Sequence, residues 1–157
     1  MEREQLLRMW DELWESGLWA ASLSKAVEDL TAQQAAWKPD LPPGEGGRRH
    51  SIWQIVNHLM FWREVAVRRT MGGPSPDERE VASRNFDAPA PADVRDVTSG
   101  NWQAAREKLG ESHRLVRAAI ADESLSLERF PYVLAHDCYH VGQIMMLRGM
   151  QGLKPIE

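Results

Sequence analysis

The feature that most constrains the fold is a pair of histidines, His136 and His140, in the segment HDCYHVGQI. Side chains four residues apart lie one turn above the other on the same face of a helix. At this spacing one helix can offer two ligands to one metal ion. The pair is also in register with apolar residues that recur every three or four positions from Val133 to Leu147. The segment therefore predicts a bundle helix that carries two imidazoles on its buried face.

Two buried imidazoles side by side cost free energy unless each finds a hydrogen bond or a metal. A single histidine on an apolar stripe is more often a hydrogen-bonded core residue, whereas two in register make the core and metal interpretations about equal. A third imidazole from another helix would favour the metal. His58 and His113 both qualify, and periodicity favours His58 only slightly. His50, among glycines and arginines, is expected in a solvated loop.

Composition narrows the classes of protein that fit. The 157 residues are enough for one domain with its own core, and we expect residues 1–157 to form a single domain. A formal net charge of -4, with both signs interspersed, gives no electrostatic signature of nucleic-acid binding. No apolar run reaches the roughly 18 residues needed to span a bilayer, so we expect no membrane partner.

Cysteine content and the first residues bear on the compartment. The single Cys138 excludes an internal disulfide framework and is typical of a reducing cytoplasm. The segment MERE at the start has neither the basic region nor the apolar core of a signal peptide. We therefore expect a cytoplasmic protein.

The periodicity of apolar residues predicts an all-α four-helix bundle. Capping boxes are predicted at Thr31–Gln34 and at Ser51–Gln54, and the second of these opens the second long helix. Residues 38–50 are rich in proline and glycine and are expected to form a loop. The predicted long helices cover residues 2–29, from Ser51 to about 72, 101–121 and 131–148.

Residues 72–98 form an unusually long polar connection with four prolines. Extended at about 3.3 Å per residue, this stretch could run the length of a helix of about 30 Å. Such a crossover would make the second and third long helices parallel.

The sequence resembles the DinB-like (YfiT-type) metal-binding four-helix-bundle family. The resemblance covers essentially the whole chain, and it is carried by WQIVNHL at 53–59 and HDCYHVGQI at 136–144, with WKP at 37–39 and FWRE at 61–64. It implies that His58, His136 and His140 are the three ligands of a divalent metal and that His113 is not a ligand.

Three neutral imidazoles without a thiolate suit Zn, Ni, Fe or Co. Three protein ligands leave a position open for water or substrate, where a metal lowers the pKa of bound water to about 7 or deprotonates a thiol. Gln143 shares the histidine face and is expected to fix an imidazole tautomer or to meet substrate. Asp137 lies about 100° away and is expected in helix packing or at the surface. Cys138 is expected to be inert core.

The resemblance also implies a reaction class. Relatives include transferases and isomerases that use a low-molecular-weight thiol such as bacillithiol or mycothiol, which suggests a metal-dependent S-transferase acting on a small-molecule electrophile. Trp53 and Trp62 are available to form an apolar mouth for it. The alternatives are a metal-dependent hydrolase and a non-catalytic, stress-related metal-binding bundle. A zincin-type protease is disfavoured, because Asp137 stands where that motif has glutamate.

A homodimer is the expected assembly. The fourth predicted helix is apolar on nearly every side, and the first carries Trp10, Trp14 and Trp19, more than one buried seam can cover. A large exposed apolar patch is unusual on a monomer.

Overall fold

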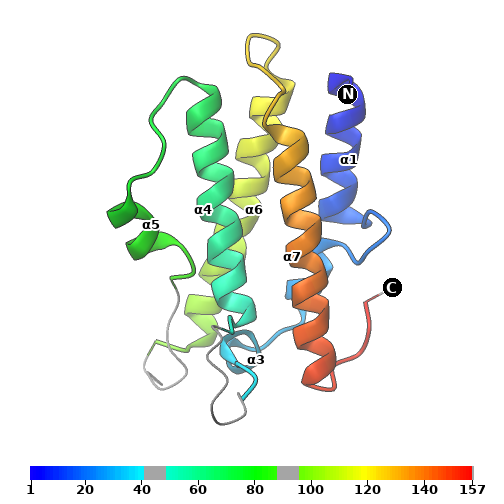
Figure 1. Cartoon of the computed structure of the whole chain (residues 1–157). Helices are drawn as coiled ribbons and strands as arrows, with labels where there is room; N and C mark the ends of the chain where they lie inside the picture. Colours follow the sequence, from blue (N-terminus) through cyan, green and yellow to red (C-terminus); the bar gives the residue numbers. More distant parts are fainter. Residues whose placement is uncertain (41–48, 88–95, 157) are drawn as a thin grey trace.

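The computed structural model describes residues 1–40, 49–87 and 96–156, and within these ranges all regular structure is helical (Figure 1). None of the helices in the described ranges combines the length and hydropathy needed to cross a membrane. The helices are α1 (Arg3–Glu15), α2 (Leu23–Glu28), α3 (Ala32–Ala36), α4 (Ile52–Thr70), α5 (Glu78–Arg84), α6 (Ser99–Ala121) and α7 (Phe130–Met150).

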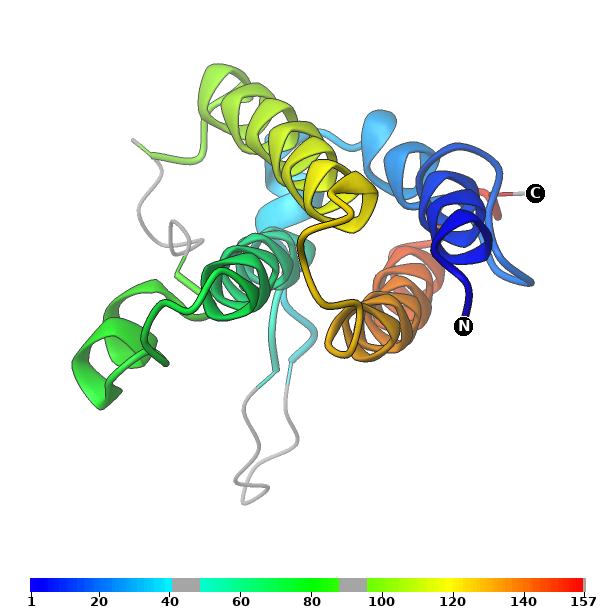
Figure 2. The same ribbon diagram turned by 90° about the horizontal axis from the view of Figure 1, so that it is seen from above.

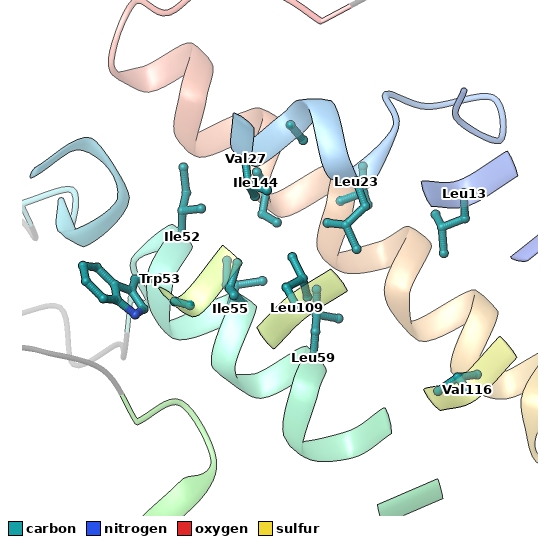
Figure 3. Packing of buried hydrophobic residues seen from close by; sticks show 14 of the residues in the cluster. Leu13, Leu23, Val27, Ile52, Trp53, Ile55, Leu59, Leu109, Val116 and Ile144 are labelled. Carbon is teal, nitrogen blue, oxygen red and sulfur yellow. The ribbon is translucent and has the colours of Figure 1, made fainter. Parts of the chain in front are cut away.

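The four longest helices, α1, α4, α6 and α7, lie side by side, and Figure 2 shows them arranged around a common centre. Helices α4 and α6 run in the same direction, whereas α1 and α7 run in the opposite one (Figure 1). Helix α4 packs against α6 and α7, and α1 packs against the same two helices. Figure 3 shows part of the core they share, where Ile55 and Leu59 of α4 lie near Leu109 of α6.

The helix starts follow from local capping. Ser51 and Thr31 each accept a hydrogen bond from the backbone N–H three residues later, and the glutamine there bonds back, so both predicted capping boxes are confirmed. Pro131 lies in the first turn of α7, as predicted. The second, third and fourth predicted helices correspond to α4, α6 and α7 within about two residues at each end.

The prediction of one continuous first helix over residues 2–29 was wrong, because α1 ends at Glu15 and α2 begins at Leu23. Gly17 follows the end of α1 with φ of 91°, in the left-handed region that favours glycine. A side chain here would also collide with the Ala20 carbonyl, 2.0 Å from where its Cβ would lie. The apolar period continues across this break because α2 also packs on α6 and α7.

The connection between α4 and α6 is not wholly extended, because it contains α5. This short helix is fixed to α4 by ion pairs from Arg68 to Glu80 at 2.9 Å and from Arg84 to Glu64 at 2.5 Å. Residues 88–95 of the predicted crossover, and residues 41–48 of the predicted loop at 38–50, lie outside the described residues. The ion pairs place the residues that follow α5 against α4.

Candidate metal centre

Three imidazoles converge between α4 and α7. His58 comes from the middle of α4, and His136 and His140 come from successive turns of α7. The Nε2 atom of His136 lies 3.0 Å from Nε2 of His58 and 3.2 Å from Nε2 of His140. Two imidazole nitrogens bound to one tetrahedral zinc at 2.0–2.1 Å would be about 3.3 Å apart. The three rings are therefore spaced as the ligands of one metal ion are.

Each of these rings meets an oxygen atom at its other nitrogen. The Nδ1 atom lies 2.5 Å from Oδ1 of Asn85 for His58, 3.2 Å from Oδ1 of Asp137 for His136, and 2.7 Å from Oε1 of Gln143 for His140. The orientation of the Gln143 amide is fixed from its other end, because its Nε2 donates to the Tyr139 hydroxyl at 2.9 Å.

These acceptors settle which nitrogen of each imidazole carries the proton. A carboxylate or amide oxygen accepts a hydrogen bond from Nδ1–H, so each neutral ring keeps its lone pair on Nε2. The three lone pairs then point at one another across about 3 Å, which is unfavourable unless a cation lies between them. The arrangement fits a divalent metal that prefers nitrogen ligands.

The protonation state supports the same conclusion. Burial lowers the pKa of His58 to about 4, and the neighbouring His140 and His136 lower it further, whereas the hydrogen bond that His58 donates to Asn85 raises it. Burial also lowers the pKa of His140, with His136 as the next cause. Both rings are therefore neutral near pH 7, which is the form that binds a metal.

Asp137 was predicted in helix packing or at the surface, and the surface alternative was wrong, because its side chain is fully buried. Its Oδ2 accepts a hydrogen bond from Nε of Arg63 at 2.7 Å, while its Oδ1 faces His136. Arg63 is also fully buried and donates to Oγ of Ser112 at 2.9 Å. His136 of α7 is thus connected, through the Asp137 carboxylate and Arg63, to α4 and α6.

The residues that follow α5 also cover the His58 ring. The Phe86 ring stacks on His58 with centroids 4.0 Å apart and on His50 at 3.7 Å, so it lies between the two imidazoles. Phe86 has φ of 57°, which is uncommon for a residue with a side chain, and its carbonyl accepts from Nε2 of Gln54 at 3.1 Å. His50, expected in a solvated loop, is instead half-buried and stacked.

A family model for the DinB superfamily matches residues 18–144. The chain belongs to the DinB superfamily. Neither the search of curated proteins nor the search of solved structures found a match. The DinB match includes the three clustered histidines and also His113, so it does not by itself separate ligands from core residues.

The remaining candidates of the DinB chain lie at different distances from the cluster. Trp62 is next to His58, with ring centroids 6.3 Å apart, whereas Trp53 is buried against Trp102 at 5.2 Å. Cys138 is half-buried outside the cluster, and burial raises the pKa of its thiol. His113 lies between the rings of Trp10 and Trp14 on the other side of the bundle.

Cavities open on two sides of the cluster. One of about 690 Å³ is lined by Asn85 and Phe86 together with the cationic side chains of Lys38 and Arg49. A second, of about 470 Å³, reaches Gln143. A groove of about 350 Å³ between α4 and α7 includes His136 in its wall. The two larger cavities therefore reach residues that contact the imidazoles, Asn85, Phe86 and Gln143, whereas the groove reaches His136 itself.

Sequence reasoning did not anticipate Asn85 and Phe86. Both lie in the connection between α4 and α6, where no periodicity indicates a partner, and their position depends on the ion pairs that fix α5. A polar residue that can accept a hydrogen bond from a ligand histidine is expected in any such site, but its position in the chain is not set by local spacing.

Proposed function

We propose that this protein binds one divalent metal ion through His58, His136 and His140, on a four-helix bundle whose second and third long helices are joined by a long crossover. The observation that carries the proposal is that the Nε2 atoms of the three histidines converge. In each ring the other nitrogen, Nδ1, meets an oxygen atom that accepts a hydrogen bond. Zn, Ni, Fe and Co are the metals that such a set of ligands suits.

We further propose that the protein is a metal-dependent S-transferase that joins a low-molecular-weight thiol to an electrophile. When bound, the metal would supply Lewis acidity, which lowers the pKa of a coordinating thiol. In the reaction the thiol loses its proton, its sulfur forms a bond to the electrophilic carbon, and the leaving group departs with the bonding electron pair. Three protein ligands leave room for the sulfur.

The residues of the chain would orient the two substrates. Bacillithiol and mycothiol are polar molecules, and the cavity of about 690 Å³ offers them Lys38, Arg49 and Gln54. The groove beside His136 is more apolar and includes Trp62, which suits the electrophile. Asn85, Asp137 and Gln143 would hold the imidazoles in position throughout the reaction.

Cobalt-substituted protein tests the thiol proposal. Bacillithiol, mycothiol, glutathione and coenzyme A would each be added with a generic electrophile, and we expect one of them to produce a sulfur-to-cobalt charge-transfer band and turnover. Thiol binding should release a proton, because the bound form is the thiolate. No band and no turnover with any thiol would refute the transferase proposal. Turnover that survives in metal-free protein would refute the role of the metal.

The expected partner is a second copy of the chain, and α7 carries the surface for it. Tyr139 and Met146 are 64% and 65% exposed, and a contiguous exposed apolar patch often marks an interface between proteins. They belong to an exposed stripe with three- and four-residue spacing, made of Ala135, Tyr139, Gly142, Met146 and Gly149. We propose that this stripe packs against its counterpart in a homodimer, in the cytoplasm that Cys138 indicates.

Gly142→Arg tests the dimer without disturbing the fold. A Cβ at Gly142 would meet nothing within 4 Å, and the residue is exposed, so a side chain there can extend into solvent in the monomer. Light scattering should give twice the chain mass of 17.9 kDa for the wild type and for Gly100→Arg, a matched change at another open helical glycine. Gly142→Arg should give the monomer mass. A wild-type monomer at micromolar concentration would contradict the dimer.

A further inference from the structure

The groove between α4 and α7 has a largely apolar wall. His136 and Trp62 both line this wall, and the Trp62 ring contacts His58, so the groove begins at the histidine cluster. Farther along, Val65, Ala66 and Val133 line it, and no carboxylate contributes to the lining. Concave apolar surfaces of this kind bind the hydrocarbon part of a ligand.

Two arginines, Arg69 of α4 and Arg129 of α7, also line the groove. Both side chains are exposed, and among the described residues neither forms an ion pair or a hydrogen bond. The neighbouring Arg68 shows the contrast, because it is paired with Glu80 at 2.9 Å. The groove therefore contains two positive charges that no carboxylate of the described chain neutralises.

The antiparallel packing of α4 and α7 puts both arginines at the same end of the groove (Figure 1). Arg69 follows Trp62 by seven residues, and Arg129 precedes His136 by seven residues. At 1.5 Å per residue, the arginines lie about 10 Å along the helices from the level of His136. The groove thus has a chemically reactive end and a cationic end.

We propose that this groove selects an elongated apolar electrophile that carries an anionic group, a carboxylate, sulfonate or phosphate, roughly eight bonds from its reacting atom. The apolar body lies on Ala66 and Val133, and the anion is bound by Arg69 and Arg129 in charge-assisted hydrogen bonds. The inference rests on the proposed function, since a metal held beside His136 is what makes that end reactive.

Octanesulfonate is a suitable probe, because it has an apolar chain of the required length and its sulfonate is a poor metal ligand. Binding would be followed by amide NMR shifts in zinc-loaded and in chelator-treated protein, with octanol as the neutral comparison. We expect shifts confined to residues 62–69 and 129–136, and octanesulfonate binding at least fivefold tighter than octanol. Equal affinities of the two ligands would overturn the proposal.

Variants separate the two parts of the groove. Replacing both Arg69 and Arg129 by Met keeps the apolar part of each side chain and removes its charge. The double variant should bind octanesulfonate at least fivefold more weakly and octanol with unchanged affinity. Arg8→Met, at an exposed arginine of α1 outside the groove, should leave the affinity for both ligands unchanged. Ala66→Leu should weaken the binding of both ligands, because the larger side chain would fill part of the groove. Unchanged octanesulfonate affinity in the double variant, or in Ala66→Leu, would overturn the assignment.

Cobalt loading tests the orientation of the ligand. The terminal methyl signal of octanesulfonate should broaden more than the methylene next to the sulfonate, because the methyl end lies near the histidines. The opposite order would overturn the proposed orientation. Metal content measured on the same samples separates the two claims. Protein that retains zinc but fails these tests refutes the groove alone, and protein that binds octanesulfonate as expected without binding zinc refutes the metal function.

Discussion

Two regions of this molecule bury histidine in contrasting ways. Between α4 and α7, the Nε2 atom of His136 lies 3.0 Å from that of His58 and 3.2 Å from that of His140. Between α1 and α6, His113 is stacked between Trp10 and Trp14, with centroids 5.2 and 4.9 Å away. Its Nδ1 has no hydrogen-bond partner in the described residues, and its Nε2 is 3.8 Å from Asp11.

Burial and pKa do not distinguish these regions. His58 and His113 are 8% and 5% exposed, and burial lowers the pKa of each to about 4. The difference lies in where the unprotonated nitrogen points. In the cluster this nitrogen faces other imidazoles. Neither nitrogen of His113 faces another imidazole, and its ring instead packs between two tryptophan rings. The direction of the lone pair is therefore the property that separates a ligand from a core residue.

Arg63 connects the two regions, and its removal is expected to have the largest effect on stability. Its guanidinium lies 5.0 Å from the Trp10 ring on one side and binds Asp137 on the other. Arg63→Met would leave the Asp137 carboxylate buried without its cation, which costs about 3–5 kcal/mol. Chemical denaturation measures this cost as a fall in the free energy of unfolding.

Arg148→Met is the matched control, because Arg148 is equally buried but its partner Asp29 is 59% exposed and can be hydrated. We expect a smaller loss there and no change in metal affinity. Equal losses of stability in the two variants would show that Asp137 is not held as the structure indicates.

The second prediction concerns Asn85, whose amide oxygen fixes the His58 tautomer. Asn85→Leu removes the acceptor and should lower zinc affinity about 10–100-fold, the usual effect of losing a partner of a metal-bound histidine. Asn85→Asp keeps an acceptor at the same position and should retain affinity within a few-fold. Competition with a zinc chelator measures both. Loss of affinity in Asn85→Asp as large as in Asn85→Leu would contradict the assigned hydrogen bond.

The sequence predicts the long helices well because their signals are local. The apolar period and the Ser51 and Thr31 capping boxes depend on residues three or four apart, and each helix start depends on the same short range. The break after Glu15 was missed because the apolar period continues beyond it, although Gly17 is a signal for a helix end.

The candidate site is only partly local. The spacing of His136 and His140 defines half of it, but periodicity left His58 and His113 nearly equal, and only the resemblance separated them. The partners of the imidazoles depend on tertiary contacts. Asp137 is buried because Arg63 reaches it from α4, and Asn85 meets His58 because α5 is fixed to α4. No pattern along the chain records either contact.

The smallest expected effect is a pH dependence that comes from His113. Burial, and after it the positive charge of Arg63, lowers the pKa of His113 from 6.5 to about 4. The unfolded chain therefore binds more protons between these values, and stability falls as the pH falls from about 6.5 towards 4. In chelator-treated protein at pH 5, the free energy of unfolding should fall by about 1–2 kcal/mol less in His113→Phe than in the wild type, relative to the value of each protein at pH 7. An identical pH dependence in wild type and variant would contradict the buried neutral ring.

The measurement that tests the central claim most directly is the metal content of three purified proteins. Wild type and His113→Phe should each retain about one divalent ion per chain after dialysis, because the stacked imidazole takes no part in binding. His136→Ala should retain none, because the remaining two imidazoles cannot complete the site. The account would be contradicted if His136→Ala kept a full ion per chain while His113→Phe lost it.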